Sequence, residues 1–138
     1  MNNPKVILFV CKHNRFRSKV AEAFFNKYNK NKDYVAMSAG LLPGAYPLDK
    51  IQVQTAKKFG IKLSGRPKPI TTDLLRYKVN FMVIVADNVP SEIFNNNKYG
   101  RKEIIWGIED DYTGEDKEID IIIKKIEDKV KLLVESLK

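Results

Sequence analysis

An uninterrupted run of five apolar residues, 6–10, leads directly into Cys11, the only cysteine among 138 residues. A continuous apolar run of this length is typical of a strand buried on both faces of a parallel sheet. A helical pattern follows from Ser18 to Asn29, with Val20, Ala21, Phe24 and Phe25 facing inward. The sequence therefore predicts a strand, a loop and a helix in succession, with Cys11 where the strand gives way to the loop.

Apolar runs and helical patterns alternate along the rest of the chain. We expect strands at residues 34–38, 81–86 and 103–106, and helices at 47–59, 73–77, 90–94 and 119–137. Pro47 is expected in the first turn of its helix, and Gly60 is placed to end that helix. Strands separated by helices favour right-handed crossovers and a parallel sheet covered on both faces, which is a three-layer α/β sandwich.

Length and composition predict one domain spanning residues 1–138. A hydrophobic content of 43% is sufficient for one core. The longest apolar run near the N-terminus has five residues, too short for a signal peptide or a membrane span. One cysteine cannot form an internal disulfide, and a reactive thiol suits a reducing compartment. We therefore expect a cytoplasmic protein, a monomer, without contact to a membrane.

The chain carries a formal net charge of +8, which raises the question of a nucleic-acid partner. However, many of the lysines lie in helical stretches in which acidic residues are interspersed, a pattern typical of a solvated surface. We therefore expect no nucleic-acid partner. A positive field would instead speed the encounter with phosphorylated or acidic substrates.

The residues after the first strand, CKHNRFRS at 11–18, predict a loop that binds an anion. Backbone N–H groups of such a loop, with the positive end of the following helix, can surround a tetrahedral oxyanion. Arg17 adds a planar fork of donors, and Lys12 and Arg15 favour the nucleophilic thiolate of Cys11. A buried, inert cysteine is the alternative, but the basic neighbours argue against it. The expected chemistry is transfer of an anionic group onto sulfur.

Residues 6–25, VILFVCKHNRFRSKVAEAFF, resemble the opening of the low-molecular-weight protein tyrosine phosphatase superfamily, which also contains the thioredoxin-coupled arsenate reductases. Later segments resemble the family in the same order: residues 38–40 with Pro47, residues 59–61 with Ser64, and residues 106–112. The resemblance implies a flavodoxin-like, phosphotyrosine phosphatase I-like sheet of order 2-1-3-4. It also implies hydrolysis of phosphate monoesters, preferentially phosphotyrosine in proteins or aryl phosphates, through a phosphocysteine on Cys11. No metal or other cofactor is expected.

The resemblance also implies roles for the loop side chains. Ser18 is expected to hydrogen-bond the Cys11 sulfur, although from its position it could equally cap the helix. Asn14 is expected to hold the loop through side-chain hydrogen bonds, whereas a turn residue in a left-handed backbone is the simpler reading. His13, the only histidine, is expected to shape the loop, because transfer to a thiolate needs no histidine base. The phosphate or similar oxyanion should lie within the loop, whose remaining members are Lys12, Arg15, Phe16 and Arg17.

Expelling an alkoxide or phenolate from phosphorus requires a proton donor. The family places Asp-Pro-aromatic in its late loop, and residues 110–112 fit that register, so Asp110 is the expected acid. Asp111 stands where the family usually has proline, which frees the backbone angle and adds a like charge, so Asp111 remains an alternative acid. Tyr46 and Tyr112 are expected to wall the pocket and contact the ring of phosphotyrosine.

Two departures from the family bear on the activity. The arsenate reductases require two further cysteines, around the third strand and the loop after it, where residues 85–90 read VADNVP. An internal thiol relay is therefore impossible, and arsenate reduction would need an external thiol to resolve the Cys11 adduct. Phe16 replaces a second cysteine of many members, so oxidised Cys11 would also depend on external thiols. A cysteine phosphocarrier and a non-catalytic phosphate-binding module are further alternatives, against which Arg17 and Asp110 argue.

Overall fold

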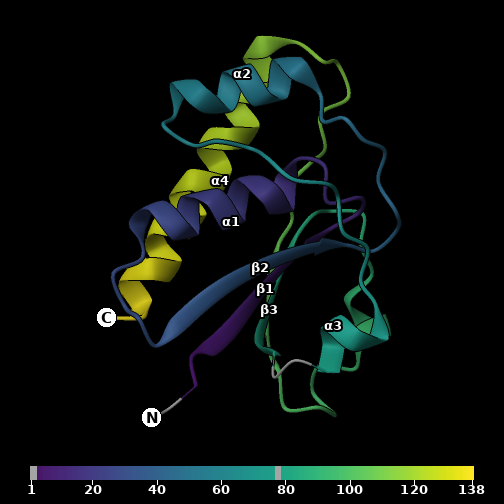
Figure 1. Ribbon diagram of the computed structural model, residues 1–138, viewed down its shortest axis with the longest axis vertical. Helices are drawn as coiled ribbons and strands as arrows, with labels where there is room; N and C mark the ends of the chain where they lie inside the picture. Colours follow the sequence, from purple (N-terminus) through teal and green to yellow (C-terminus); the bar gives the residue numbers. More distant parts are fainter. Residues whose placement is uncertain (1–2, 77–78) are drawn as a thin grey trace.

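The computed structural model describes residues 3–76 and 79–138, and it contains one parallel sheet. Its strands are β1 (Lys5–Cys11), β2 (Tyr34–Gly40), β3 (Val79–Val85) and β4 (Lys102–Trp106). They lie in the order β2-β1-β3-β4, and each neighbouring pair is parallel (Figure 1). The predicted strand order is therefore confirmed.

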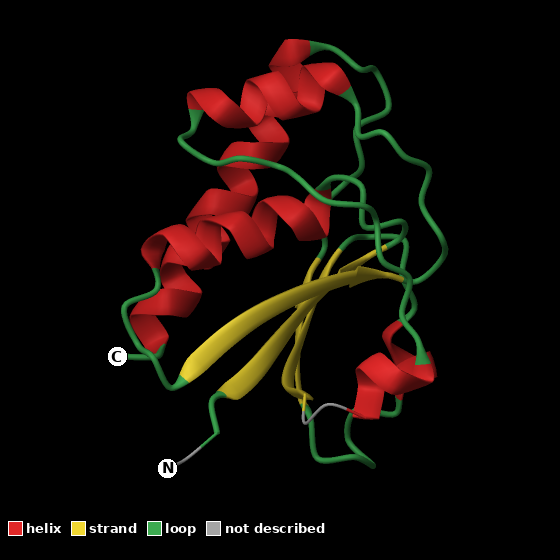
Figure 2. Cartoon of the chain, in the orientation of Figure 1, coloured by secondary structure: helices red, strands yellow, loops and turns green. Residues whose placement is uncertain are grey.

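Helices and a short helical turn cover the sheet on both faces (Figure 2). The elements are α1 (Arg17–Tyr28), α2 (Lys50–Lys58), α3 (Thr72–Arg76), the 3-10 turn η1 (Ser91–Phe94) and α4 (Asp116–Ser136). Helices α1 and α4 pack on one face, where α2 lies against α4, and α3 and η1 contribute Leu74 and Phe94 to the core of the other face. The expected three-layer α/β sandwich is thus confirmed.

The two faces explain the unbroken apolar run of β1. Ile7 and Phe9 point into the core beneath α1 and α4, whereas Leu8 and Val10 point into the core on the opposite face. All four side chains are fully buried. Successive side chains of a strand alternate between faces, so a strand covered on both sides needs apolar residues at every position.

Several predicted boundaries differ from the observed ones. Helix α2 begins at Lys50, because the Asp49 carboxylate caps it by accepting the backbone N–H of Gln52 at 2.9 Å, so Pro47 lies before the helix. Residues 90–94, predicted as a short helix, contain the short 3-10 helix η1. Strand β2 continues through Gly40, two residues beyond its predicted end. The predicted end of the 73–77 helix lies outside the described residues.

A buried polar contact joins α1 to α4. The hydroxyl of Tyr28 donates to Glu127 Oε2 at 2.6 Å. This hydrogen bond raises the pKa of Tyr28. Burial raises the pKa of Glu127, but the hydrogen bonds from Tyr28 and Lys124 outweigh it, so that pKa lies below its usual value. Each group therefore stabilises the packing in the charge state that prevails near neutral pH.

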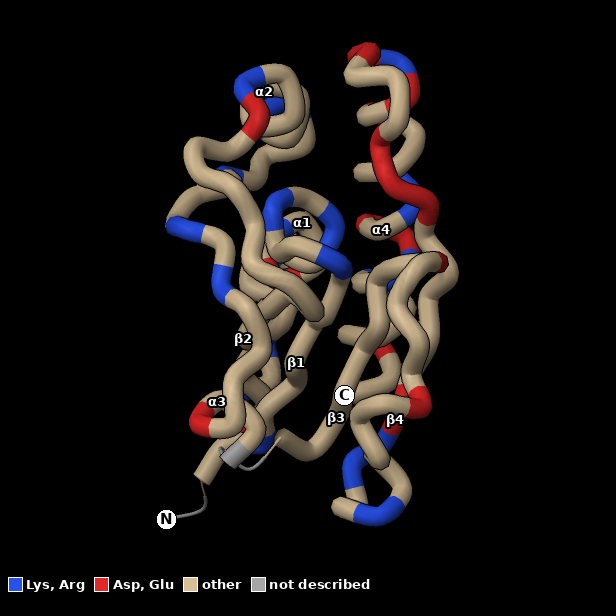
Figure 3. The backbone as a smooth tube through the Cα atoms, turned by 90° about the vertical axis from the view of Figure 1, so that its right-hand side faces the viewer, with Lys and Arg blue, Asp and Glu red and all other residues tan. Residues whose placement is uncertain are grey.

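Because β1, β3 and β4 are parallel, the loops that follow them meet at the carboxyl end of the sheet. Lys and Arg are distributed over several elements, and acidic residues recur along α4 (Figure 3). Within residues 3–76 and 79–138, none of the helices has the length and apolar character needed to cross a membrane.

Candidate active site

Cys11 is the last residue of β1, and its side chain is 2% exposed. Its Sγ lies 3.0 Å from Ser18 Oγ and accepts the backbone N–H of Ser18 at 3.4 Å. Ser18 stands one residue inside α1, which Phe16 precedes as the capping position, so the proposed capping role of Ser18 is wrong. The helix N-terminus is instead directed at the sulfur, where its N–H groups suit a negative charge.

Asn14 organises the loop between Cys11 and α1. It is fully buried and has a left-handed backbone, with φ of 55°. Its Nδ2 donates to Ser18 Oγ at 2.7 Å and to Ser38 Oγ at 3.0 Å, while its Oδ1 accepts the backbone N–H of Lys68 at 2.9 Å. Because Ser18 Oγ accepts from Asn14, its own hydrogen is free to point at the Cys11 sulfur. Asn14 therefore has both predicted properties: it adopts the left-handed backbone of a turn residue, and its side chain holds the loop by hydrogen bonds.

Arg17 is 2% exposed and ties together the loops that follow three strands. Its Nη1 donates to the carbonyl oxygen of Ile108 at 2.9 Å, and its Nη2 donates to Asn88 Oδ1 at 3.1 Å. Two carboxylates lie close to the guanidinium, Asp87 at 3.6 Å and Asp110 at 3.4 Å. Sequence reasoning named Asp110 but missed the roles of Asp87 and Asn88. Their position after the third strand, at the same sheet edge, was the available signal.

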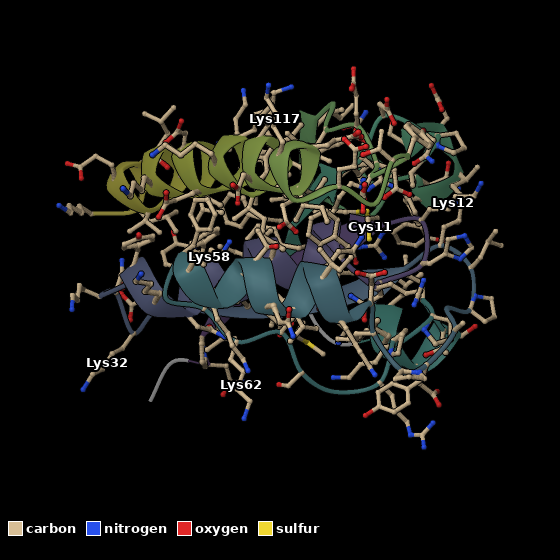
Figure 4. All side chains as sticks on the ribbon, turned by 90° about the horizontal axis from the view of Figure 1, so that it is seen from above. Cys11, Lys12, Lys32, Lys58, Lys62 and Lys117 are labelled. Atoms are coloured by element: carbon tan, nitrogen blue, oxygen red, sulfur yellow. The ribbon has the colours of Figure 1, made fainter. Side chains whose placement is uncertain are left out.

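A cavity of about 130 Å³ opens beside the sulfur. It is lined by Cys11, His13, Arg15, Phe16, Arg17, Gln52, Asp110 and Asp111. In Figure 4, Cys11 lies between the loops near one end of the molecule, with Lys12 farther toward the edge. A larger cavity of about 290 Å³ lies on the far side of α1, where Lys19 and Glu22 contribute to its lining. The smaller cavity is the candidate site because it contains the nucleophilic sulfur.

The predicted aromatic wall is absent from the lining of this cavity. Tyr46 and Tyr112 are 52% and 73% exposed. The guanidinium of Arg66 lies 4.6 Å from the ring centroid of Tyr46, an arrangement that stabilises an outward-facing ring. Phe16 and His13 are the rings that line the cavity instead. The structure therefore places neither tyrosine in the lining of this cavity, and their contact with a substrate ring stays a prediction.

Two loop side chains fasten the segment 43–47 alongside the site. His13 Nδ1–H donates to the carbonyl oxygen of Pro43 at 3.1 Å. Arg15 donates from Nε to the carbonyl of Ala45 at 2.8 Å and from Nη2 to that of Pro47 at 3.1 Å. These contacts give His13 and Arg15 a structural function in addition to their place in the cavity wall.

The acidic loop after β4 is fixed by hydrogen bonds. Asp110 Oδ1 accepts the backbone N–H of Asp111 at 2.8 Å, and Asp110 Oδ2 is the atom nearest Arg17. Asp111 uses both of its oxygens: Oδ2 accepts from Gln52 Nε2 at 3.0 Å, and Oδ1 accepts the backbone N–H of Gly114 at 2.8 Å. Sequence reasoning missed Gln52, because nothing in the local pattern of α2 marks it.

Lys19 lies behind the loop and is almost fully buried. Its Nζ donates to the carbonyl oxygens of Ser64 at 3.0 Å and Arg66 at 3.5 Å. Burial lowers the pKa of Lys19, and the nearby Glu22 carboxylate partly opposes this effect. Among the residues that the structure describes, no group of three or more His, Cys, Asp or Glu side chains is placed to hold a metal ion.

Known proteins resemble the chain over nearly its full length. Residues 6–138 match the family "Low molecular weight phosphotyrosine protein phosphatase". An arsenate reductase of Halalkalibacterium halodurans is 25% identical over 130 residues, covering 93% of this chain and 91% of its own. The low molecular weight protein tyrosine phosphatase of T. tengcongensis superposes with a TM-score of 0.79 at 25% identity, covering 96% of this chain and 99% of the other.

A solved arsenate reductase from Archaeoglobus fulgidus DSM 4304 has a TM-score of 0.71 at 26% identity, covering 93% of this chain and 98% of the other. Both activities therefore occur among the similar proteins. The match over residues 6–138 nevertheless decides the family. The chain belongs to the low molecular weight phosphotyrosine protein phosphatase family and is therefore an enzyme of that superfamily.

Proposed function

We propose that the protein hydrolyses phosphate monoesters, preferentially protein phosphotyrosine, through a phosphocysteine intermediate on Cys11. One observation carries the proposal: a sulfur, a guanidinium and a carboxylate, those of Cys11, Arg17 and Asp110, line the same small cavity. A nucleophile, a clamp for phosphate oxygens and a proton donor are what a phosphomonoester requires for transfer to sulfur.

In the first half-reaction, the Cys11 thiolate attacks phosphorus opposite the leaving oxygen, so an S–P bond forms as the P–O bond breaks. Loop N–H groups and Arg17 hold the equatorial oxygens. The Asp110 carboxylate lies 3.4 Å from the Arg17 guanidinium, so a bound phosphate competes with Asp110 for that guanidinium. Oδ2 of Asp110 is then available to protonate the leaving oxygen.

In the second half-reaction, a water molecule replaces the departed alcohol and attacks the phosphocysteine. Asp110, now ionised, takes a proton from this water, and the S–P bond breaks to release inorganic phosphate. The Ser18 hydroxyl, 3.0 Å from Sγ, stabilises the thiolate as it leaves. The hydrogen bond from Asn14 to Ser18 supports this orientation of the hydroxyl.

The preference for phosphotyrosine rests on depth. Cys11 is 2% exposed at the base of its cavity, so a long leaving group brings phosphorus to sulfur more readily than the short side chain of phosphoserine. The family assignment supports the same substrate class. Because Tyr46 and Tyr112 face outward, Phe16 is the candidate ring to contact the substrate.

Reduction of arsenate is a second candidate, favoured by the arsenate reductase relative and by a cavity of about 130 Å³ that suits a small tetrahedral oxyanion. Cys11 would displace hydroxide from arsenate, and an external thiolate would then attack the Cys11 sulfur. Arsenic leaves as arsenite with the two electrons, and a mixed disulfide remains. A second external thiol regenerates Cys11, which is required because the chain has no other cysteine.

The test compares p-nitrophenyl phosphate, a phosphotyrosine peptide, a phosphoserine peptide, and arsenate with glutathione under matched conditions. We expect steady release of phosphate, fastest from the phosphotyrosine peptide. Cys11→Ser should abolish release while vanadate still binds, and Lys58→Gln, on the far part of α2 (Figure 4), should behave as wild type. Release of a single equivalent would indicate a phosphocarrier, and binding without release a non-catalytic module.

The acid is tested separately. Asp110→Asn should lower kcat/KM for phenyl phosphate by about 100-fold or more but kcat/KM for p-nitrophenyl phosphate much less, because this ratio reports the first half-reaction and nitrophenolate leaves without a proton. Steady turnover by Cys11→Ser, or arsenate reduction without any phosphatase activity, would overturn the proposed function.

A further inference from the structure

The amide of Gln52 is held in place by the start of α2. The Asp49 carboxylate accepts the backbone N–H of Gln52, which fixes that residue in the first helical turn. The side chain is only 9% exposed and lines the cavity beside Cys11. Most exposed glutamines of a helix are solvated, so a buried amide of this kind is expected to serve a specific partner.

That partner is the carboxylate of Asp111. Gln52 Nε2 donates to one of its oxygens at 3.0 Å, and the backbone N–H of Gly114 donates to the other at 2.8 Å. Both oxygens of Asp111 are thus already used to close the loop. Asp110 differs, because its Oδ2 lies 3.4 Å from the guanidinium that a substrate would claim. The two neighbouring carboxylates therefore have different surroundings.

The fixed position of Asp111 extends to Asp110. The backbone N–H of Asp111 donates to Asp110 Oδ1 at 2.8 Å, which sets the rotation of that carboxylate. Hydrogen bonds then lead from α2 through Asp111 to Asp110, and an ion pair links Asp110 to Arg17. Small displacements of a proton donor are costly in catalysis, so the rigidity of this loop bears directly on rate.

We propose that Gln52 and Asp111 are positioning residues, which hold the Asp110 carboxyl where it can protonate the leaving group, and that Asp111 is not itself the proton donor. The inference rests on the proposed function, since it assumes that Asp110 is the acid. In this proposal, the hydrogen bond between Gln52 and Asp111 controls the backbone geometry at position 111.

The first test removes the amide. Gln52→Ala should lower kcat/KM for phenyl phosphate by about tenfold, with little change in kcat/KM for p-nitrophenyl phosphate and in vanadate affinity. Gln54→Ala is the matched control, because Gln54 is an exposed glutamine of the same helix. An equal loss of kcat/KM for both substrates would mean that Gln52 supports the structure in general, and would overturn the proposal.

The second test exchanges donor and acceptor. Gln52→Glu alone places two carboxylates opposite each other and should slow phenyl phosphate hydrolysis. Adding Asp111→Asn restores a donor and an acceptor at the same two positions, while Asn still accepts from Gly114, so activity should recover. Asp111→Asn alone should keep most activity, because the Gln52 amide can turn over to accept. An Asp111→Asn variant that behaves like Asp110→Asn, or a double variant no faster than Gln52→Glu, would overturn the proposal.

A measurement independent of turnover separates this inference from the proposed function. Gln52→Ala should accelerate amide hydrogen exchange at Gly114, whose N–H is bonded to Asp111, whereas Gln54→Ala should not. If the wild-type protein has no phosphatase activity, the proposed function fails while this link between α2 and the loop is still measured. Unchanged exchange at Gly114 would overturn the positioning proposal even in an active enzyme.

Discussion

Replacing Asn14 tests the structure of the loop most directly. Asn14→Ala removes three hydrogen bonds, to Ser18, Ser38 and Lys68, each of which contributes about 1 kcal/mol. It also places alanine at φ of 55°, which costs about 1 kcal/mol relative to a residue that tolerates the left-handed region. The sum predicts a loss of about 4 kcal/mol in the free energy of unfolding, a large part of the stability of a typical domain of about 5–15 kcal/mol.

Urea denaturation, followed by circular dichroism, measures this loss. Asn95 offers a matched control, because it also has a left-handed backbone, with φ of 49°, but is exposed. Asn95→Ala should therefore lose only the backbone contribution of about 1 kcal/mol. Asn14→Gly should recover about the same amount relative to Asn14→Ala, because glycine adopts this conformation without strain.

The free energies of unfolding of Asn14→Ala and Asn95→Ala decide between the two readings. If Asn14→Ala and Asn95→Ala destabilise the protein equally, the buried hydrogen bonds do not hold the loop. Activity gives a second readout, since Asn14 directs the Ser18 hydroxyl to the sulfur. A stable Asn14 variant with unchanged kcat would therefore contradict the role assigned to this network in the release of Cys11.

Two further substitutions test other parts of the fold. Tyr28→Phe should cost about 1–3 kcal/mol at neutral pH, measured by urea denaturation. The contribution of the Tyr28–Glu127 hydrogen bond to stability should disappear as pH falls through the pKa of Glu127, which lies below its usual 4.5. It should also disappear as pH rises through the pKa of Tyr28, which lies above its usual 10.0. A destabilisation by Tyr28→Phe that stays constant across these limits would contradict the pairing. Gly40→Ala should lower both vanadate affinity and Tm, because a Cβ there would lie 2.6 Å from the backbone carbon of His13. Gly107→Ala, with open space around the added carbon, is the control, and equal behaviour of the two variants would refute the clash.

The sheet and the phosphate loop were predictable because they depend on short-range patterns. The apolar run of residues 6–10 requires burial on both faces, and this fixed β1 as an inner strand with Cys11 at its end. The spacing of Cys11, Arg17 and Ser18 lies within one strand–loop–helix unit, so their proximity follows from local geometry. The sequence also contained the charges of the late loop, although it left Asp110 and Asp111 as alternatives.

Tertiary structure decided which distant residues complete the site. Gln52 reaches Asp111 only because α2 starts at Lys50 and packs near the acidic loop, a relation that neither segment encodes alone. Asn88 reaches Arg17 because β3 ends beside β1.

The same reason explains where the structure differs from the predictions. Pro47 and Ser18 each suited the start of a helix by local preference, yet the Asp49 cap and the Cys11 sulfur determined their actual surroundings. Tyr46 was expected in the pocket wall, but it lies outside the cavity lining, with Arg66 over its ring. Local propensities are worth only fractions of a kcal/mol per residue, so packing and hydrogen bonding between distant segments override them.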